Sequence, residues 1–170
     1  HYRIDSFRFD LMGHQPRAAM ERLQRTVDTA ADRHIQLIGE GWNFGEIADG
    51  RRFVQASQLS LNGSGIGTFS DRARDAIRGG SAGDSDARQV SAQGYVNGLH
   101  YAPNADAKPG VKAADLMRTA DIVRVGLAGS LRHFRLVTYD GRELPLEQIA
   151  YAGSQPAGYV TSPGEVVNYF

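Results

Sequence analysis

The sequence lacks the residues that define several classes of protein. None of its 170 residues is cysteine, so disulfide frameworks and cysteine-based zinc sites are excluded. Its five histidines lie singly along the chain, and we expect no structural metal and no cofactor. The 19 basic residues balance the 19 acidic ones, so no field of one sign favours nucleic acid or an anionic membrane surface as a partner. A neutral polymer such as a polysaccharide suits this balance.

Long apolar runs are also missing. No stretch approaches the roughly 20 residues that span a bilayer, and the N-terminus lacks the basic and apolar regions of a signal peptide. The chain opens without methionine on a strand-like run, residues 1–10, and closes on another, residues 166–170. We therefore expect that it is cut from a longer parent protein.

Two kinds of spacing predict a βαβ unit near the N-terminus. Residues alternate in type from Ile4 to Asp10, which is typical of a strand. Apolar residues recur at helical spacing from Pro16 to Arg33, and the apolar run Ile35–Glu40 follows as a second strand. Strand, helix and strand in succession predict parallel strands joined by a right-handed crossover.

The rest of the chain is expected to continue as one globular domain. Its composition, 41% hydrophobic and 22% charged, is that of a protein with one domain-sized core, and neither an internal repeat nor a domain boundary is evident. The further predicted elements are a short strand at Ile66–Phe69, helices at Asp86–Asn97, Ala113–Leu131 and Leu146–Ala150, a turn at Asp140-Gly141 and a final strand at Val166–Phe170.

Two carboxylates fall where the first two predicted strands end. Asp10 ends the first strand, and Glu40 ends the second between Gly39 and Gly41, which would let a substrate approach the backbone. The C-terminal ends of parallel strands form the functional rim of such folds. If the strands are neighbours, their spacing of about 4.8 Å allows the separation of roughly 5–5.5 Å that a retaining glycosidase requires.

Arg8 gives the two carboxylates different surroundings. It shares a strand face with Asp10, and a fixed cation favours the ionised form that a nucleophile needs. Glu40 lies near Trp42 without such a partner, which would let it hold the proton of a general acid. The alternative is that Arg8 and Asp10 form a plain ion pair closing a strand and that Glu40 begins a helix.

Five segments resemble a known family. Residues Phe7–His14 resemble the fourth-strand motif of the α-amylase family of glycoside hydrolases in its pullulanase-type form, and Gly39–Asn43 resembles the fifth-strand motif. The segments Phe69–Arg78, Ile122–Gly129 and Gln155–Tyr159 resemble other pullulanase segments. The resemblance covers nearly the whole chain. It implies an α/β fold in which residues 1–170 form part of one catalytic (β/α)8 TIM barrel, about strands 4 to 7 with long βα loops.

The resemblance also implies catalytic roles. Asp10 would be the nucleophile that forms a covalent glycosyl-enzyme, and Glu40 the acid that protonates the leaving oxygen and then acts as base toward water. Arg8 would hold Asp10 and the transition-state charge. The family's third catalytic carboxylate lies beyond the chain, and Ser6 stands where the family usually has glycine.

Four further residues are candidate substrate contacts. His14 matches a position that contacts sugar on the leaving-group side, and Trp42 offers a flat stacking platform, although a lone tryptophan at a strand end is as often packing. Asn43 lies in the fifth-strand motif. Asp71 follows the predicted third strand, where a surface ion pair with Arg72 is the alternative.

The resemblance implies a parent enzyme that hydrolyses α-1,6 branch linkages in pullulan, starch or glycogen with retention. Its partners would be an α-glucan and the remainder of the barrel, with self-association through exposed strand edges and no nucleic acid or membrane. The resemblance leaves room for calcium elsewhere in such a parent, and secretion or a periplasmic location is the family expectation. The isolated chain is expected to be inactive. The alternatives are an α-1,4-acting amylase or branching enzyme, or a non-catalytic carbohydrate-binding piece.

Overall fold

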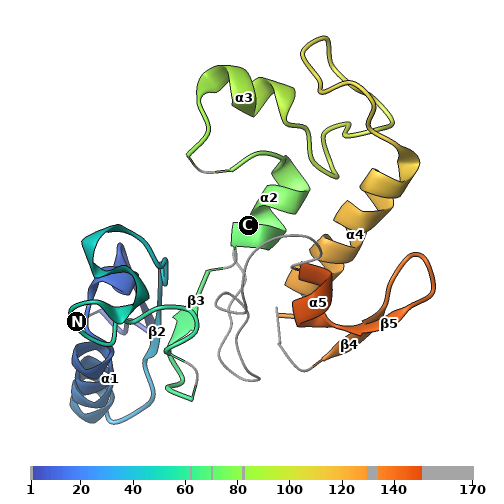
Figure 1. Ribbon diagram of the computed structural model, residues 1–170. Coiled ribbons are helices and arrows are strands. Elements are labelled where there is room, and N and C mark those ends of the chain that lie inside the picture. The colour runs from blue at the N-terminus through green and yellow to red at the C-terminus, as the bar shows by residue number, and fades with distance from the viewer. Residues whose placement is uncertain (1, 62, 70, 82, 130–133, 151–170) are drawn as a thin grey trace. The chain divides into compact units, whose positions relative to one another are not determined.

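The computed structural model describes residues 2–61, 63–69, 71–81, 83–129 and 134–150. These residues divide into two compact units, the first ending at Phe69 and the second beginning at Asp71. Figure 1 labels the elements of each unit. Among the residues that the structure describes, no helix has the length and apolar character needed to cross a membrane.

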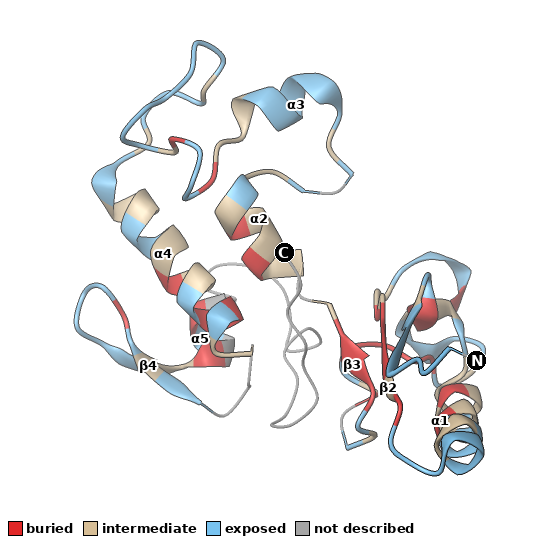
Figure 2. Ribbon diagram, turned by 180° about the vertical axis from the view of Figure 1, so that it is seen from behind, coloured by how far each residue is buried: buried red, intermediate tan, exposed pale blue. Residues whose placement is uncertain are grey.

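The first unit contains the predicted βαβ arrangement. Its regular elements are β1 (Ser6–Phe9), α1 (Arg17–Ala31), β2 (Gln36–Gly39) and β3 (Gly67–Thr68), with short 3₁₀ helices η1 (Met12–His14) and η2 (Gly45–Gly50). The sheet order is β1-β2-β3, and both pairings are parallel. The predicted parallel strands and connecting helix are therefore confirmed. Within this sheet β1 is an edge strand, and three of its four residues are exposed. Figure 2 shows β2 and β3 as mostly buried.

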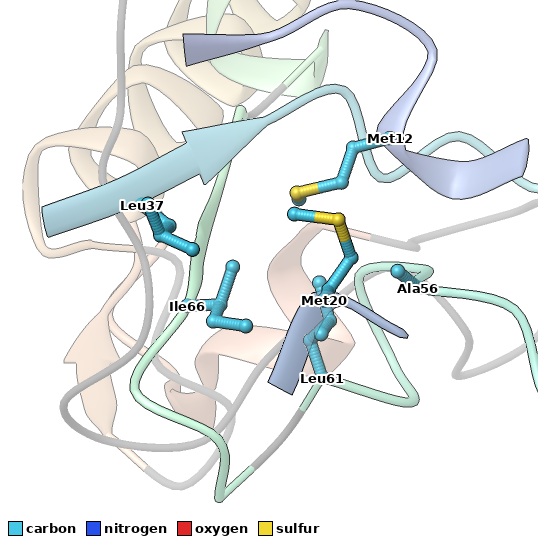
Figure 3. Packing of buried hydrophobic residues seen from close by; sticks show 6 residues of the cluster. All are labelled: Met12, Met20, Leu37, Ala56, Leu61 and Ile66. Carbon is cyan, nitrogen blue, oxygen red and sulfur yellow. The ribbon is translucent and has the colours of Figure 1, made fainter. Parts of the chain in front are cut away.

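One face of α1 packs on this sheet. Its residues Leu23 and Val27 lie against a buried cluster, and Met12 and Met20 point toward each other inside it (Figure 3). The cluster consists of Met12, Met20, Leu37, Ala56, Leu61 and Ile66. Each fully buried side chain of this size contributes about 1.5–3 kcal/mol relative to an exposed one. The residues that follow β2 and precede β3 thus help to bury both strands.

The second unit is mainly helical. Its elements are α2 (Asp71–Arg78), α3 (Asp86–Ser91), α4 (Ala113–Leu127), β4 (Arg135–Val137), β5 (Glu143–Pro145) and α5 (Leu146–Ala150). Helix α4 packs against α2 and α5, and β4 pairs with β5 as an antiparallel hairpin. The buried carboxylate of Asp121 joins α4 to the hairpin, because it pairs with Arg124 (2.9 Å) and accepts the Tyr139 backbone N–H (2.9 Å).

Several expectations about the second unit need correction. Helix α3 ends at Ser91 instead of Asn97, because the backbone of Ala92 leaves the helical region with φ −93° and ψ 83°. Helix α4 ends at Leu127 instead of Leu131. Helix α2 and the β4–β5 hairpin around the predicted turn were not expected. The predicted strand 166–170 and the segment 155–159 lie outside the described residues.

The described elements define a mixed α/β protein. They include five strands in two separate sheets, and no closed sheet occurs among them. The parallel sheet of the first unit has the strand direction that a barrel segment requires. Residues 1–170 as part of one barrel domain stay a prediction.

Asp28 fixes the turn from α1 to β2. Its Oδ1 accepts hydrogen bonds from the Ile35 backbone N–H and the Gln24 amide, both at 2.8 Å, and its Oδ2 lies 3.2 Å from Nδ1 of His34. The hydrogen bond from Ile35 is the main cause that lowers the pKa of Asp28 below its ordinary value of 3.8, with His34 and Gln24 adding to it. The hydrogen bonds thus stabilise the ionised carboxylate in the folded state.

We predict that Asp28→Asn makes stability less dependent on acid pH. A carboxylate whose pKa is lowered by folding contributes stability that is present above its ordinary pKa and is lost as pH falls through the folded pKa. Urea unfolding at a series of pH values from neutral down through 3.8 should therefore give a shallower loss of unfolding free energy for the variant than for the wild type. Asp32→Asn at the same helix end is the control. Equal slopes for Asp28→Asn and the wild type would contradict this account.

Candidate active site

The register of the sheet places Asp10 and Glu40 at the same edge. Phe9 pairs with Gly39 as the last residue pair of β1 and β2, and each carboxylate residue comes directly after its strand. The Glu40 backbone N–H donates to the Phe9 carbonyl at 3.2 Å, which extends the pairing by one step. The predicted adjacency of the two strand ends is therefore confirmed.

The Arg8 guanidinium bridges the two carboxylates. Its Nη1 donates to Oδ1 of Asp10 at 2.7 Å, and its Nη2 donates to Oε1 of Glu40 at 2.9 Å. The expectation that Glu40 has no cationic partner is wrong, because the long forked side chain of Arg8 reaches across to the neighbouring strand. The hydrogen bond to Asp10 is the main cause that raises the pKa of Arg8 above its ordinary value, and the charge of Glu40 adds to it. Arg8 is a permanent cation at this site.

Glu40 is also held by the loop that follows β1. Its Oε2 accepts the Leu11 backbone N–H at 2.9 Å, and its carbonyl accepts the Gly13 N–H at 2.6 Å. Leu11 has φ +48°, in the left-handed region that a non-glycine residue adopts at a cost. Both carboxylate oxygens of Glu40 are therefore engaged. To give a proton to a leaving oxygen, Glu40 must exchange one of these donors for the sugar.

The two carboxylates differ in accessibility. The Asp10 side chain is 71% exposed, whereas that of Glu40 is 21% exposed. An exposed carboxylate held by one cation is suited to attack on a bound substrate. A more enclosed carboxyl group beside it is suited to proton transfer, because fewer water molecules compete for its proton.

The glycines around Glu40 serve the packing of the protein itself. A Cβ on Gly39 would lie 2.6 Å from the Phe9 carbonyl oxygen, and one on Gly41 would lie 2.7 Å from Cγ2 of Thr68 and 2.8 Å from the Gln58 nitrogen. The expectation that these glycines open the backbone to a substrate is wrong, since the protein's own atoms occupy that space. Tight packing on both sides fixes the backbone of Glu40.

The predicted substrate contacts lie in different surroundings. His14 is in η1, where its ring packs edge-on against Phe44 at 4.5 Å between centroids, and its buried Nδ1 has no hydrogen-bond partner among the described residues. Trp42 is half-buried. Asn43 exchanges two hydrogen bonds with Asp49, at 2.9 and 2.8 Å, which gives its amide a structural role in the loop.

Asp71 begins α2 in the second unit and is half-buried. Because Asp71 lies in the second unit, the geometry of the first unit does not test it as a substrate contact. That role stays a prediction. The described residues contain no group of three or more side chains that could hold a metal ion.

Two residues near the carboxylates were not predicted. The ring of Phe69 lies 5.4 Å from the Arg8 guanidinium carbon, which is the geometry of a cation–π contact. Gln58 is buried and donates its side-chain N–H to the Phe69 carbonyl. Both lie far from Arg8 in the sequence, and no local pattern signals their approach.

Glycosidases rely on a pair of carboxyl groups that flank the bond to be cleaved. No family model matches the chain. Over 99% of its length it is 36% identical to the chloroplastic pullulanase 1 of Arabidopsis thaliana and 41% identical to a pullulanase of Klebsiella pneumoniae. A crystal structure of Klebsiella pneumoniae pullulanase complexed with maltotriose superposes with a TM-score of 0.81 at 39% identity, covering 99% of this chain and 15% of that one.

The chain is thus homologous to the glycosidases named pullulanases along nearly its whole length, and the resemblance found in its motifs is confirmed. It spans only 18% of the Arabidopsis protein and 15% of the Klebsiella protein.

We predict that Gly41→Ala destabilises the first unit. The added methyl group would overlap Thr68 and the Gln58 backbone, and overpacking of this kind typically costs about 1–3 kcal/mol of unfolding free energy. Gly83→Ala is the matched control, because a Cβ there meets no heavy atom within 4 Å, and its effect should stay within about 0.5 kcal/mol. Urea unfolding measures both. A Gly41→Ala protein as stable as the wild type would contradict the packing argument.

Proposed function

We propose that the chain carries the nucleophile and the general acid of a retaining glycosidase that cleaves α-1,6 linkages in α-glucans. The observation that carries the proposal is the Arg8 bridge between Asp10 and Glu40 at adjacent strand ends. One guanidinium in contact with both groups supports the short carboxylate separation, about 5–5.5 Å, of retaining enzymes. The homology to pullulanases supports the linkage and the substrate.

The mechanism assigns one role to each carboxylate. Asp10 attacks the anomeric carbon, a bond forms between its oxygen and that carbon, and the glycosidic C–O bond breaks as Glu40 gives its proton to the leaving oxygen. Glu40, now ionised, takes a proton from water, and the water oxygen displaces Asp10. Two inversions give net retention. Arg8 holds Asp10 aligned, and it stabilises the negative charge that Glu40 gains as it gives up its proton.

The substrate is an α-glucan chain. A pullulanase relative crystallised with maltotriose supports an oligoglucoside at this site. Trp42 would stack on a sugar ring, and His14 would meet the sugar on the leaving-group side. We do not extend a substrate role to Asn43, because Asp49 engages its amide.

We also propose that residues 1–170 form part of a single (β/α)8 barrel. The parallel β1-β2-β3 order and the exposed edge strand β1 support it, as does the small share of each pullulanase that the chain spans. The remaining strands would pair with β1 and supply the third catalytic carboxylate. Without them, the edge of β1 is free to pair with another chain.

Substitution of each carboxylate in the complete enzyme tests the roles. We predict that Asp10→Asn lowers kcat on pullulan by roughly 10⁴-fold or more, since the covalent step is lost. Glu40→Gln should lower it by about 10²–10⁴-fold, the range of general acid–base catalysis. Asp5→Asn, which removes an exposed carboxylate paired with Arg33 just before β1, is the control and should keep wild-type kcat. Reducing-end release measures all three.

A substrate whose leaving group needs no protonation separates the two roles. On an α-glucosyl fluoride, Glu40→Gln should recover most of its first-step rate, while Asp10→Asn should not. Recovery in both variants or in neither would contradict the assignment.

Cleavage confined to amylose would instead favour the α-1,4-acting alternative.

The 170-residue chain purified by itself should release no reducing ends from pullulan. The reason is that, under this proposal, the rest of the barrel supplies the third carboxylate and pairs with the edge of β1, which has no other strand partner than β2 among the described residues. The complete enzyme assayed beside it is the control. Turnover by the chain alone would contradict the proposal that the site needs the rest of the barrel.

A further inference from the structure

Gln58 connects the ends of β2 and β3. Its backbone N–H donates to the Gly41 carbonyl at 3.0 Å, next to Glu40. Its side-chain Nε2 donates to the carbonyl of Phe69, which directly follows β3. Only 3% of the residue is exposed, so both hydrogen bonds are shielded from water. One buried residue therefore fixes the backbone at both strand ends.

Phe69 connects Gln58 to Arg8. Its ring lies 5.4 Å from the Arg8 guanidinium carbon, and its N–H donates to the Gly39 carbonyl at 3.2 Å. The Arg8 side chain is half exposed and has many rotamers, so a contact beyond its two hydrogen bonds restricts it further. The aromatic face of Phe69 supplies this contact.

We propose that Gln58 is a positioning residue that acts through Phe69 to hold the Arg8 guanidinium between Asp10 and Glu40. This inference rests on the proposed function. Gln58 does not contact either carboxylate in the structure, and its effect on the reaction is exerted through the Phe69 carbonyl and ring. An apolar residue of the same size would fill the space but would leave the Phe69 carbonyl without this donor.

Gln24 provides a matched comparison within the same unit. It is also a buried glutamine whose Nε2 donates to a backbone carbonyl, that of Ile35 at 2.8 Å, just before β2 begins. The Oε1 atoms of Gln24 and Gln58 are both buried without a hydrogen-bond partner among the described residues. Both side chains thus donate to a backbone carbonyl, at opposite ends of β2, and Gln24 also donates to Oδ1 of Asp28 at 2.8 Å. Of the two side chains, only that of Gln58 donates to a residue, Phe69, whose ring contacts Arg8.

The test compares Gln58→Met and Gln24→Met in the complete enzyme. Both variants should unfold at a lower temperature, because each removes a glutamine donor to a backbone carbonyl. Gln58→Met should lower kcat on pullulan roughly 10- to 100-fold with KM changed less than about twofold, the effect of a small misplacement at the reacting groups. Gln24→Met should keep wild-type kcat. Crystal structures of both variants should show Arg8 displaced from one carboxylate in Gln58→Met only.

A second substitution tests the route through the ring. Phe69→Leu should reduce kcat to a similar extent, and the double variant Gln58→Met/Phe69→Leu should be no slower than the slower single variant, since both act on one chain of contacts. If Gln58→Met does not fold, Gln58→Asn keeps the amide but shortens its reach, and the same readouts apply.

The inference is overturned if Gln58→Met loses stability as Gln24→Met does but keeps both its kcat and the Arg8 position. Additive losses in the double variant would overturn the route through Phe69. Failure of the wild-type enzyme to cleave any α-glucan would refute the proposed function, and the position of Arg8 in the crystal structures would then still decide whether Gln58 positions it.

Discussion

The parallel pairing of β1 with β2 is the constraint on which the candidate site depends. With Phe9 opposite Gly39, the next residues along both strands are Asp10 and Glu40. Because side chains alternate along a strand, a shift of the register by one residue would turn one carboxylate away from the other. The buried cluster against α1 fixes that register, since Leu37 in β2 belongs to it and Phe9 in β1 packs against it. Packing on one face of the sheet thus determines the geometry at the carboxyl ends of its strands.

Around the two carboxylates, the backbone is strained at one residue and tightly packed at another. Stability alone does not explain these two features. Leu11 takes a left-handed backbone conformation so that its N–H reaches Glu40, and Gly41 is packed so closely that no side chain fits. Like charges at neighbouring strand ends repel, and Arg8 offsets this repulsion by contacting both. Strain and tight packing at one place on an otherwise regular sheet are typical of functional sites.

The elements that the sequence predicts well are those whose residue types recur at a short, regular spacing. The strand, helix and strand of the first unit follow from alternation and helical periodicity, and the motifs point to Asp10 and Glu40. Helix α2 was missed because five of its eight residues are charged, which leaves little apolar periodicity, and the β4–β5 hairpin because Arg135 and Val137 are exposed and carry little apolar pattern. The Arg8–Glu40 contact and the roles of Gln58 and Phe69 depend on residues far apart in the chain. No periodicity encodes such contacts.

The most direct test of the central claim is to trap the covalent intermediate. The nucleophile of a retaining enzyme reacts quickly with a fluorinated glucosyl fluoride, and the glycosyl-enzyme that forms is hydrolysed slowly. The complete enzyme should therefore become glycosylated, and mass spectrometry of its peptides identifies the residue that carries the sugar. We expect the label on Asp10, with Asp10→Asn unlabelled and Asp5→Asn labelled as the wild type is. A label on another carboxylate, or a working enzyme that never becomes labelled, would contradict the account.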